Sequence, residues 1–146
     1  MTELYKRAAV FQFEYRRSPD QDAAAPVRRP IVVVGAGPIG LATAIDLAER
    51  GNAVVLLDDA DRIGEGSRGL CYSKRALEIL DRLGAGEQVV EKGVSWKLGK
   101  VFFRNDKVYE FDLLPEAGHK MPAFVNLQQF YLEQYLVERA LDLDNL

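Results

Sequence analysis

The length, composition and charge of the chain are those of an ordinary globular protein. Its 146 residues are 48% apolar and 28% charged, which allows one domain with a hydrophobic core. A net charge of −3 and a pI near 5.3 argue against nucleic acid or an anionic membrane as partner, since either needs a basic face. The single cysteine, Cys71, cannot form an internal disulfide, and no apolar run approaches the roughly 20 residues that span a bilayer. We therefore expect a cytoplasmic protein that binds neither nucleic acid nor membrane.

Residues 1–29 are predicted to form an arm and linker that precede the folded part, residues 30–146. The stretch from Ser18 to Pro26 is polar and carries prolines, which disfavour regular structure. The aromatic residues of the arm would pack either on their own domain or on a partner subunit, as in a homodimer, and the sequence leaves both open. These aromatic residues are Tyr5, Phe11, Phe13 and Tyr15.

An apolar strand followed directly by glycines is the central feature of the sequence. The branched residues 31–34 predict a strand of a parallel sheet, buried on both faces. Three glycines then follow in the pattern G-x-G-x-x-G. Gly35 permits the tight turn, Gly37 lets the backbone approach a pyrophosphate, and Gly40 lets the next helix pack against the strand.

The helix that begins with Pro38 and Ile39 would point its first backbone N–H groups, and the positive end of its dipole, at the phosphates. A second strand, residues 54–57, follows and ends at Asp58. This carboxylate can accept hydrogen bonds from both hydroxyls of an adenosine ribose and would repel a 2′-phosphate, which favours FAD or NAD over NADP. The alternatives are a glycine turn that only packs a helix on a sheet, and an acid that only begins a solvated loop.

The next segment is a glycine-rich loop that leads to a second helix. The helix is predicted over 73–83, with Ser73 as N-cap and Gly84 as the stop. Arg68, in the loop, offers a guanidinium that would bond ribose or pyrophosphate oxygens, or would simply be solvated.

These segments together resemble a known family. They are similar to the N-terminal third of the single-component FAD-dependent aromatic hydroxylases. The resemblance rests on the glycine motif of residues 35–41, the acid at Asp58, the Ser-Arg-Gly-Leu run of 67–70 and the helix of 73–84. The resemblance covers residues 30–146. It implies an α/β fold, a Rossmann-like FAD-binding fold with a parallel sheet and helices, plus the start of an antiparallel substrate-domain sheet, and it implies that the fold is incomplete.

The resemblance also implies cofactors and site residues. FAD would be reduced by NADH or NADPH, and the complete enzyme would hydroxylate a small phenol-like aromatic substrate with O2. Arg68 matches the FAD-contacting arginine of the family, and Gln129 falls where the family has a glutamine near the ribityl or ribose part of the flavin. A competing interpretation makes Gln129 part of a capping box with Asn126 as N-cap.

Residues 94–114 predict a hairpin, with strands on either side of Asn105-Asp106 and with one buried and one solvated face. Its aromatic residues are expected in a core. Cys71 is expected to be packed, and neither Trp96 nor His119 is assigned chemistry. No catalytic residue and no metal ligand is predicted.

Two other functions remain open at this point. The chain could be a nucleotide-binding module without catalysis, or a portion of another flavoprotein oxidoreductase such as an amine oxidase. The motifs that complete the FAD site in the resembling family do not occur in the sequence, so the chain alone is expected to lack hydroxylase activity.

Overall fold

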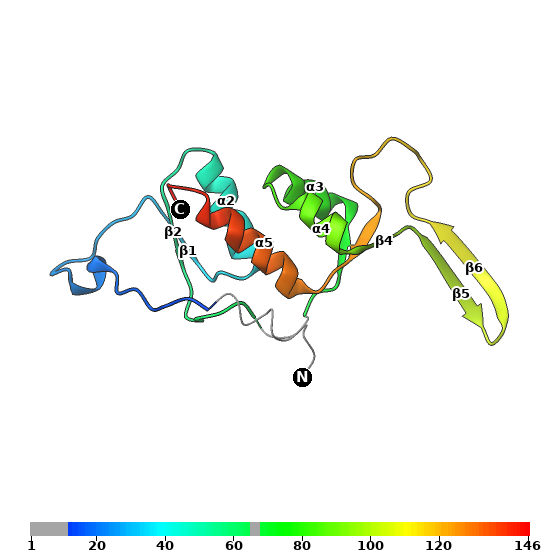
Figure 1. Cartoon of the computed structure of the whole chain (residues 1–146), viewed down its shortest axis with the longest axis horizontal. Helices are drawn as coiled ribbons and strands as arrows, with labels where there is room; N and C mark the ends of the chain where they lie inside the picture. The colour runs from blue at the N-terminus through cyan, green and yellow to red at the C-terminus, as the bar shows by residue number, and fades with distance from the viewer. Residues whose placement is uncertain (1–11, 65–67) are drawn as a thin grey trace. The chain divides into compact units, whose positions relative to one another are not determined.

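The computed structural model describes residues 12–64 and 68–146, and the chain divides into two compact units (Figure 1). The first unit contains residues 1–67 together with the C-terminal segment 129–146, and the second contains residues 68–128. Among the described residues, no helix is both long enough and apolar enough to cross a membrane. The fold is α/β, with parallel and antiparallel strand pairs, as the sequence predicts.

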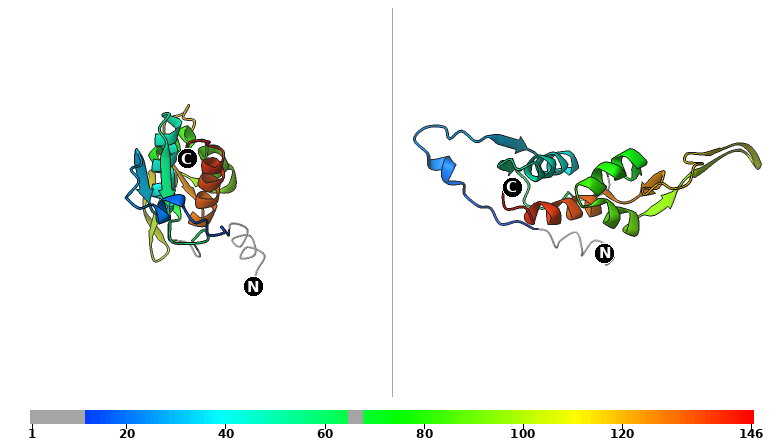
Figure 2. Two further views of the ribbon diagram at one scale, coloured as in Figure 1. Left: turned by 90° about the vertical axis from the view of Figure 1, so that its left-hand side faces the viewer. Right: turned by 90° about the horizontal axis from the view of Figure 1, so that it is seen from above.

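The first unit is built on a parallel pair of strands joined by a helix. Strand β1 (Ile31–Val34) pairs with β2 (Val54–Leu57) in the register Ile31 to Val54. Helix α2 (Pro38–Glu49) connects them, and helix α5 (Gln129–Leu141) lies beside α2 (Figure 1 and Figure 2). The predicted strand, helix and strand are confirmed.

The core of this unit lies between α2 and one face of the strand pair. Small residues of α2 allow the close packing: Ala44 and Ala48 are buried against Val54 of β2. The side chains around them come from both strands and from the chain's last residues: Ile31, Val33, Leu47, Leu56, Leu143 and Leu146. The buried positions of α2 recur at helical spacing, so they form one apolar face of the helix.

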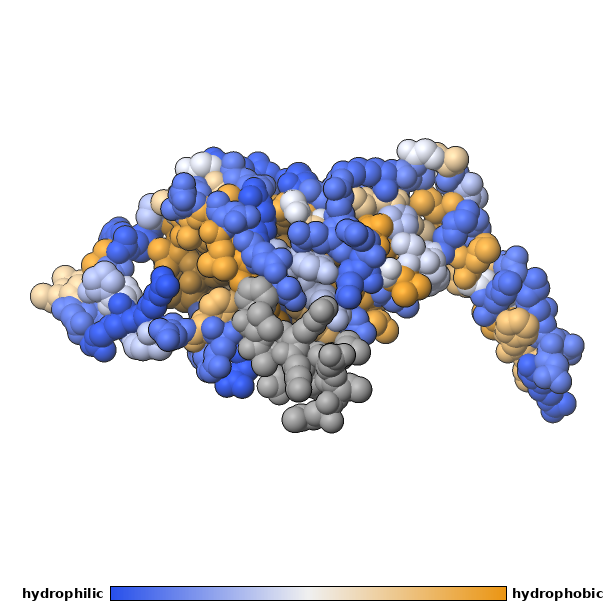
Figure 3. All heavy atoms as spheres, viewed as in Figure 1, coloured by the Kyte–Doolittle hydropathy of each residue, from blue (hydrophilic) through white to orange (hydrophobic). Residues whose placement is uncertain are grey.

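The opposite face of the two strands is exposed, so the expectation of a strand buried on both faces is wrong. Val34 is 82% exposed and Val32 is 48% exposed, while Leu57 of β2 is 49% exposed. In Figure 3 hydrophobic spheres gather in a patch over these strands. Side chains alternate between the faces of a strand, and the core forms only on the face that α2 covers.

The N-terminal arm contacts its own domain. Gln12 forms an isolated antiparallel bridge with Arg62, and the Phe13 N–H donates to the Asp61 carbonyl at 2.7 Å. The Gln12 side chain also donates to the Asp61 carboxylate. The described part of the arm is therefore hydrogen-bonded to its own domain, while its aromatic residues Phe13 and Tyr15 are exposed. Tyr5 and Phe11 lie outside the described residues.

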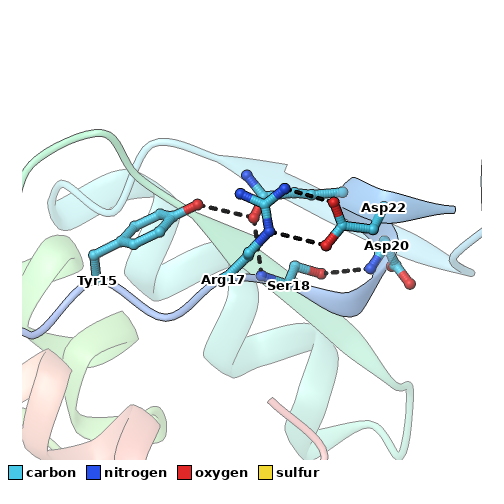
Figure 4. A network of polar contacts seen from close by, with 6 residues as sticks. Tyr15, Arg17, Ser18, Asp20 and Asp22 are labelled. Carbon is cyan, nitrogen blue, oxygen red and sulfur yellow. Dashed lines mark hydrogen bonds and ion pairs between the residues drawn. The ribbon is translucent and has the colours of Figure 1, made fainter.

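The linker contains one short helix, which corrects the expectation that its prolines prevent regular structure. The 3-10 helix η1 (Pro19–Asp22) begins with proline at its first position, where no N–H is needed, and Ser18 caps it. Figure 4 shows the polar contacts that surround it, among them the ion pair of Arg17 with Asp22. The Tyr15 hydroxyl donates to Gln21 at 2.9 Å.

The second unit contains a three-stranded antiparallel sheet in the order β3-β7-β4 and two helices. Its strands are β3 (Cys71–Ser73), β4 (Val94–Trp96) and β7 (Phe124–Asn126), and its helices are α3 (Lys74–Arg82) and α4 (Gly86–Lys92). Helix α3 matches the predicted helix, with Ser73 as N-cap. Helix α4 was not predicted.

Strands β5 (Leu98–Phe103) and β6 (Asp106–Asp112) form the antiparallel hairpin expected from the sequence (Figure 1). Its turn lies at Arg104 and Asn105, one residue earlier than expected, and Arg104 takes a left-handed φ of 54°. The expected buried face is absent from the hairpin, whose aromatic residues are mostly exposed: Phe102, Phe103 and Tyr109. A two-stranded ribbon has no second layer to bury them.

Cys71 and Trp96 are two further side chains of the second unit for which the sequence raised expectations. Cys71 is exposed on the edge strand β3, so the expectation of a packed cysteine is wrong. Trp96 stacks on Phe124, with ring centroids 5.0 Å apart, and its indole N–H donates to the Asn126 side chain at 3.0 Å. Trp96 therefore has a structural role in the sheet.

Candidate nucleotide-binding site

The glycine turn between β1 and α2 favours glycine at two of its positions, Gly35 for its backbone conformation and Gly40 for lack of space. Gly35 has a φ of 102°, a left-handed conformation that favours glycine, and its N–H donates to the Leu57 carbonyl at 2.7 Å. A Cβ placed on Gly40 would lie 1.7 Å from the Gly35 carbonyl oxygen. Helix α2 therefore packs directly on the turn, as the glycine spacing predicts.

The N-terminus of α2 is open and has no side-chain cap. Gly37 is the N-cap residue and makes no side-chain hydrogen bond, and a Cβ on Gly37 would meet no atom within 4 Å. Pro38 follows at the first helical position, and Ile39 is 80% exposed. The first backbone N–H groups of a helix need acceptors, and the helix dipole favours anions there. This turn therefore fits the pyrophosphate of a dinucleotide.

Asp58 lies beside the glycine turn, at the end of β2. Its Oδ2 accepts the Ala36 N–H at 2.5 Å, and its Oδ1 accepts the Ala60 N–H at 2.8 Å. These two bonds, that of Ala36 first, lower the pKa of Asp58 below its ordinary value, so the carboxylate is ionised at neutral pH. The side chain is exposed, and each oxygen has a second lone pair that a ribose hydroxyl can use.

Arg68 opens the second unit, where its side chain is exposed. Gln129 opens α5 in the first unit and is half-buried. The capping-box interpretation of Gln129 is wrong, because Asn126 is the last residue of β7 and its side chain accepts the Trp96 indole N–H. The Gln129 amide instead donates to the Glu133 carboxylate, one turn further along the helix, at 2.7 Å.

The sequence reasoning missed Glu133. Its side chain is only 7% exposed, and its Oε2 accepts the Gly64 N–H at 3.0 Å, from the loop that follows Asp58. A glutamate within a helix is typical of a solvated face, so no pattern singled it out. The one available signal was the spacing of Gln129 and Glu133, which places both on the same helix face.

No cluster of side chains suited to a metal ion occurs within residues 12–64 and 68–146. The described site consists of a glycine turn, an open helix N-terminus and an ionised carboxylate beside them. Together with the parallel strand pair, these features define a dinucleotide-binding α/β protein.

The particular family follows from comparison with known proteins. Residues 28–143 match the family model described as "FAD binding domain", so the chain belongs to this family. It is 28% identical over 125 residues to 6-hydroxy-3-succinoylpyridine 3-monooxygenase HspB of Pseudomonas putida. This match covers 82% of this chain and 31% of that protein. It is 41% identical over 63 residues to 3-hydroxybenzoate 6-hydroxylase of Klebsiella oxytoca, covering 43% of this chain and 16% of that protein.

A solved structure agrees with these relatives. The crystal structure of p-nitrophenol 4-monooxygenase PnpA from Pseudomonas putida has a TM-score of 0.71 at 26% identity, over 80% of this chain and 30% of that chain. The predicted resemblance to the FAD-dependent aromatic hydroxylases is confirmed. The chain spans less than a third of the length of each of these relatives.

Proposed function

We propose that this chain is the FAD-binding portion of an NADH- or NADPH-dependent monooxygenase that hydroxylates a phenol-like aromatic substrate. The observation that carries the proposal is the open glycine turn before α2 with Asp58 hydrogen-bonded to it. This arrangement offers N–H donors for phosphates and a carboxylate for ribose hydroxyls on adjacent stretches of backbone.

Each predicted site residue has a role in this proposal. The backbone of Gly35, Gly37, Pro38, Ile39 and Gly40 would hold the pyrophosphate, Asp58 the adenosine ribose, and Arg68 and Gln129 further oxygens of the cofactor. These residues bind and orient the cofactor, and none of them is proposed to move a proton. FAD, when bound and reduced, supplies the oxygen chemistry itself.

The electron donor is inferred from the resemblance to the FAD-dependent aromatic hydroxylases, and the substrate class from the relatives. Their names describe action on 3-hydroxybenzoate, p-nitrophenol and 6-hydroxy-3-succinoylpyridine, each of which is a hydroxylated aromatic ring. A related substrate and a nicotinamide electron donor are proposed for the complete enzyme. Because the chain covers less than a third of these relatives, we expect the chain alone to bind FAD without turning over a phenol.

The first experiment measures FAD retention. The purified chain is incubated with FAD, desalted and examined by visible absorption beside two variants, Asp58→Ala and Asp59→Ala. Asp59 is the matched control, because it is an exposed acid next to Asp58. We expect the parent chain and Asp59→Ala to retain flavin and Asp58→Ala to lose most of it.

Two outcomes would contradict the proposal. Retention of NAD or ADP without any affinity for FAD would indicate a nucleotide-binding module of another kind. If Asp58→Ala retains as much FAD as the parent chain, the Asp58 carboxylate does not take part in binding the cofactor. A third measurement adds NADH or NADPH and 3-hydroxybenzoate or p-nitrophenol to the flavin-loaded chain, and substrate turnover would contradict the expectation that this portion is inactive alone.

A further inference from the structure

Glu133 is a charged side chain buried in the first unit. It is 7% exposed and lies on α5 among the apolar residues Leu132, Leu136 and Val137. Removing a carboxylate from water is strongly unfavourable unless donors replace the lost solvent. Among the ion pairs found within residues 12–64 and 68–146, none involves Glu133, so its donors are neutral groups.

These donors come from two segments far apart in the sequence. The Gly64 N–H bonds Oε2 at 3.0 Å, and the Gln129 Nε2 bonds Oε1 at 2.7 Å. Gly64 lies on the loop that begins at Asp58, and Gln129 is the first residue of α5. Glu133 therefore joins the loop after the candidate ribose-binding acid to the glutamine expected near the flavin.

The carboxylate also determines which end of the Gln129 amide is free. Because the Gln129 Nε2 donates to the carboxylate, the NH2 group faces Glu133 and the carbonyl Oε1 points elsewhere. Gln129 is half-buried, and an amide held in this way has a carbonyl oxygen available as an acceptor. Hydroxyl groups, such as those of a ribityl or ribose chain, are the donors that such an acceptor suits.

We propose that Glu133 is a positioning residue of the flavin site, which fixes the Gln129 amide with its carbonyl toward a hydroxyl of FAD. The inference rests on the proposed function, because it requires that the chain binds FAD. Glu133 itself is buried and acts on the ligand through Gln129.

A second pair on the same helix provides an internal control. Gln134 donates to Glu138 at 3.0 Å with the same spacing of four residues. Glu138 is more exposed than Glu133, and in the described part of the chain no backbone N–H joins it to a loop. The two pairs therefore have the same local chemistry and differ in burial and in the connection to Gly64.

The experiment measures the FAD dissociation constant of the full chain by quenching of flavin fluorescence. The variants are Glu133→Gln, Gln129→Leu, their double variant and the control Glu138→Gln, each checked for an unchanged melting curve. In Glu133→Gln an NH2 group, which only donates, replaces one carboxylate oxygen, so the side chain no longer offers one acceptor oxygen to Gly64 and another to Gln129. We expect this variant and Gln129→Leu each to weaken FAD binding by about fivefold to tenfold, a loss typical of one hydrogen bond between neutral groups.

The double variant separates positioning from a general structural effect. If Glu133 acts through Gln129, the double variant should bind FAD no more weakly than Gln129→Leu alone. Additive losses, or unchanged binding by Glu133→Gln while the parent chain binds FAD, would overturn the inference and leave the proposed function standing. Failure of the parent chain to bind FAD would overturn both.

One measurement does not depend on the folding of Glu133→Gln. The side-chain amide signals of Gln129 and Gln134 can be assigned in nitrogen–proton NMR spectra by their loss in Gln129→Leu and Gln134→Leu. FAD should shift the Gln129 amide signal and leave the Gln134 signal in place. A Gln129 signal that does not respond to bound FAD would overturn the inference.

Discussion

Gly40→Ala adds a methyl group where helix α2 touches the glycine turn. A Cβ at position 40 would lie 1.7 Å from the Gly35 carbonyl oxygen, 2.9 Å from the Gly35 carbonyl carbon and 3.6 Å from a methyl of Val33. An ordinary contact needs about twice the first of these distances, so α2 and the turn must move apart. The neighbouring atoms belong to the backbone, which cannot rotate away as a side chain does.

The size of the effect follows from two opposing contributions. Overpacking of this kind typically destabilises a protein by about 1–3 kcal/mol, and a backbone clash belongs at the upper end. Alanine within a helix recovers up to about 1 kcal/mol relative to glycine. We therefore expect a net loss of about 2 kcal/mol, or roughly 8 °C in Tm for a chain of this size.

The assay compares thermal unfolding, followed by circular dichroism, with FAD affinity in Gly40→Ala and Gly37→Ala. Gly37 has a φ of −71°, and a Cβ there would meet no atom within 4 Å, so alanine fits without a clash. Gly37→Ala should keep the parent Tm within about 2 °C. It should nevertheless weaken FAD binding, because its methyl group occupies the space that a pyrophosphate would approach.

The opposite pattern would refute the reasoning. If Gly40→Ala melts at the parent temperature, the close contact between α2 and the turn does not exist in solution. If Gly37→Ala binds FAD as tightly as the parent chain, the open side of the turn is not where the phosphates bind.

Three further predictions concern the acid, the arginine and the sheet of the second unit. Asp58→Asn should lower Tm at pH 7, because the Ala36 N–H stabilises the ionised carboxylate and holds the folded pKa of Asp58 below its ordinary value of 3.8. The difference in Tm between this variant and the parent chain should shrink as the pH of the melting experiment falls below 3.8. Arg68→Ala should leave Tm unchanged, since the side chain is exposed, while raising the FAD dissociation constant about tenfold; equal affinity in a fluorescence titration would remove this arginine from the site. Asn126→Ala should destabilise the chain by about 1 kcal/mol in urea unfolding, because it leaves the Trp96 indole N–H without its acceptor, and an unchanged midpoint would contradict that role.

Much of the local structure could be predicted from the sequence. The strand, glycine turn, helix and second strand of residues 31–57 are present as expected, and Ser73 caps α3. These elements depend on apolar periodicity, on a capping side chain and on glycines at a turn, all of which act over a few neighbouring residues. Helix α4 was missed because it begins at Gly86, and glycine is a poor helix former.

The family assignment was also determined by the sequence. The glycine motif, Asp58 and the segment around Arg68 point to FAD-dependent aromatic hydroxylases, and the match to the FAD binding domain family over residues 28–143 confirms it. The backbone of the glycine turn carries the motif, so its residue types report directly on the conformation that the turn requires.

The surroundings of individual side chains were decided by the tertiary structure alone. Val34 and Cys71 are exposed although their residue types favour burial, and Glu133 is buried although its type favours exposure. The Gln129 amide bonds Glu133, and Glu133 in turn bonds the N–H of Gly64, a residue 69 positions away. Burial and hydrogen-bond partners depend on which distant segments come into contact in the folded chain. A local pattern of residues does not predict those contacts.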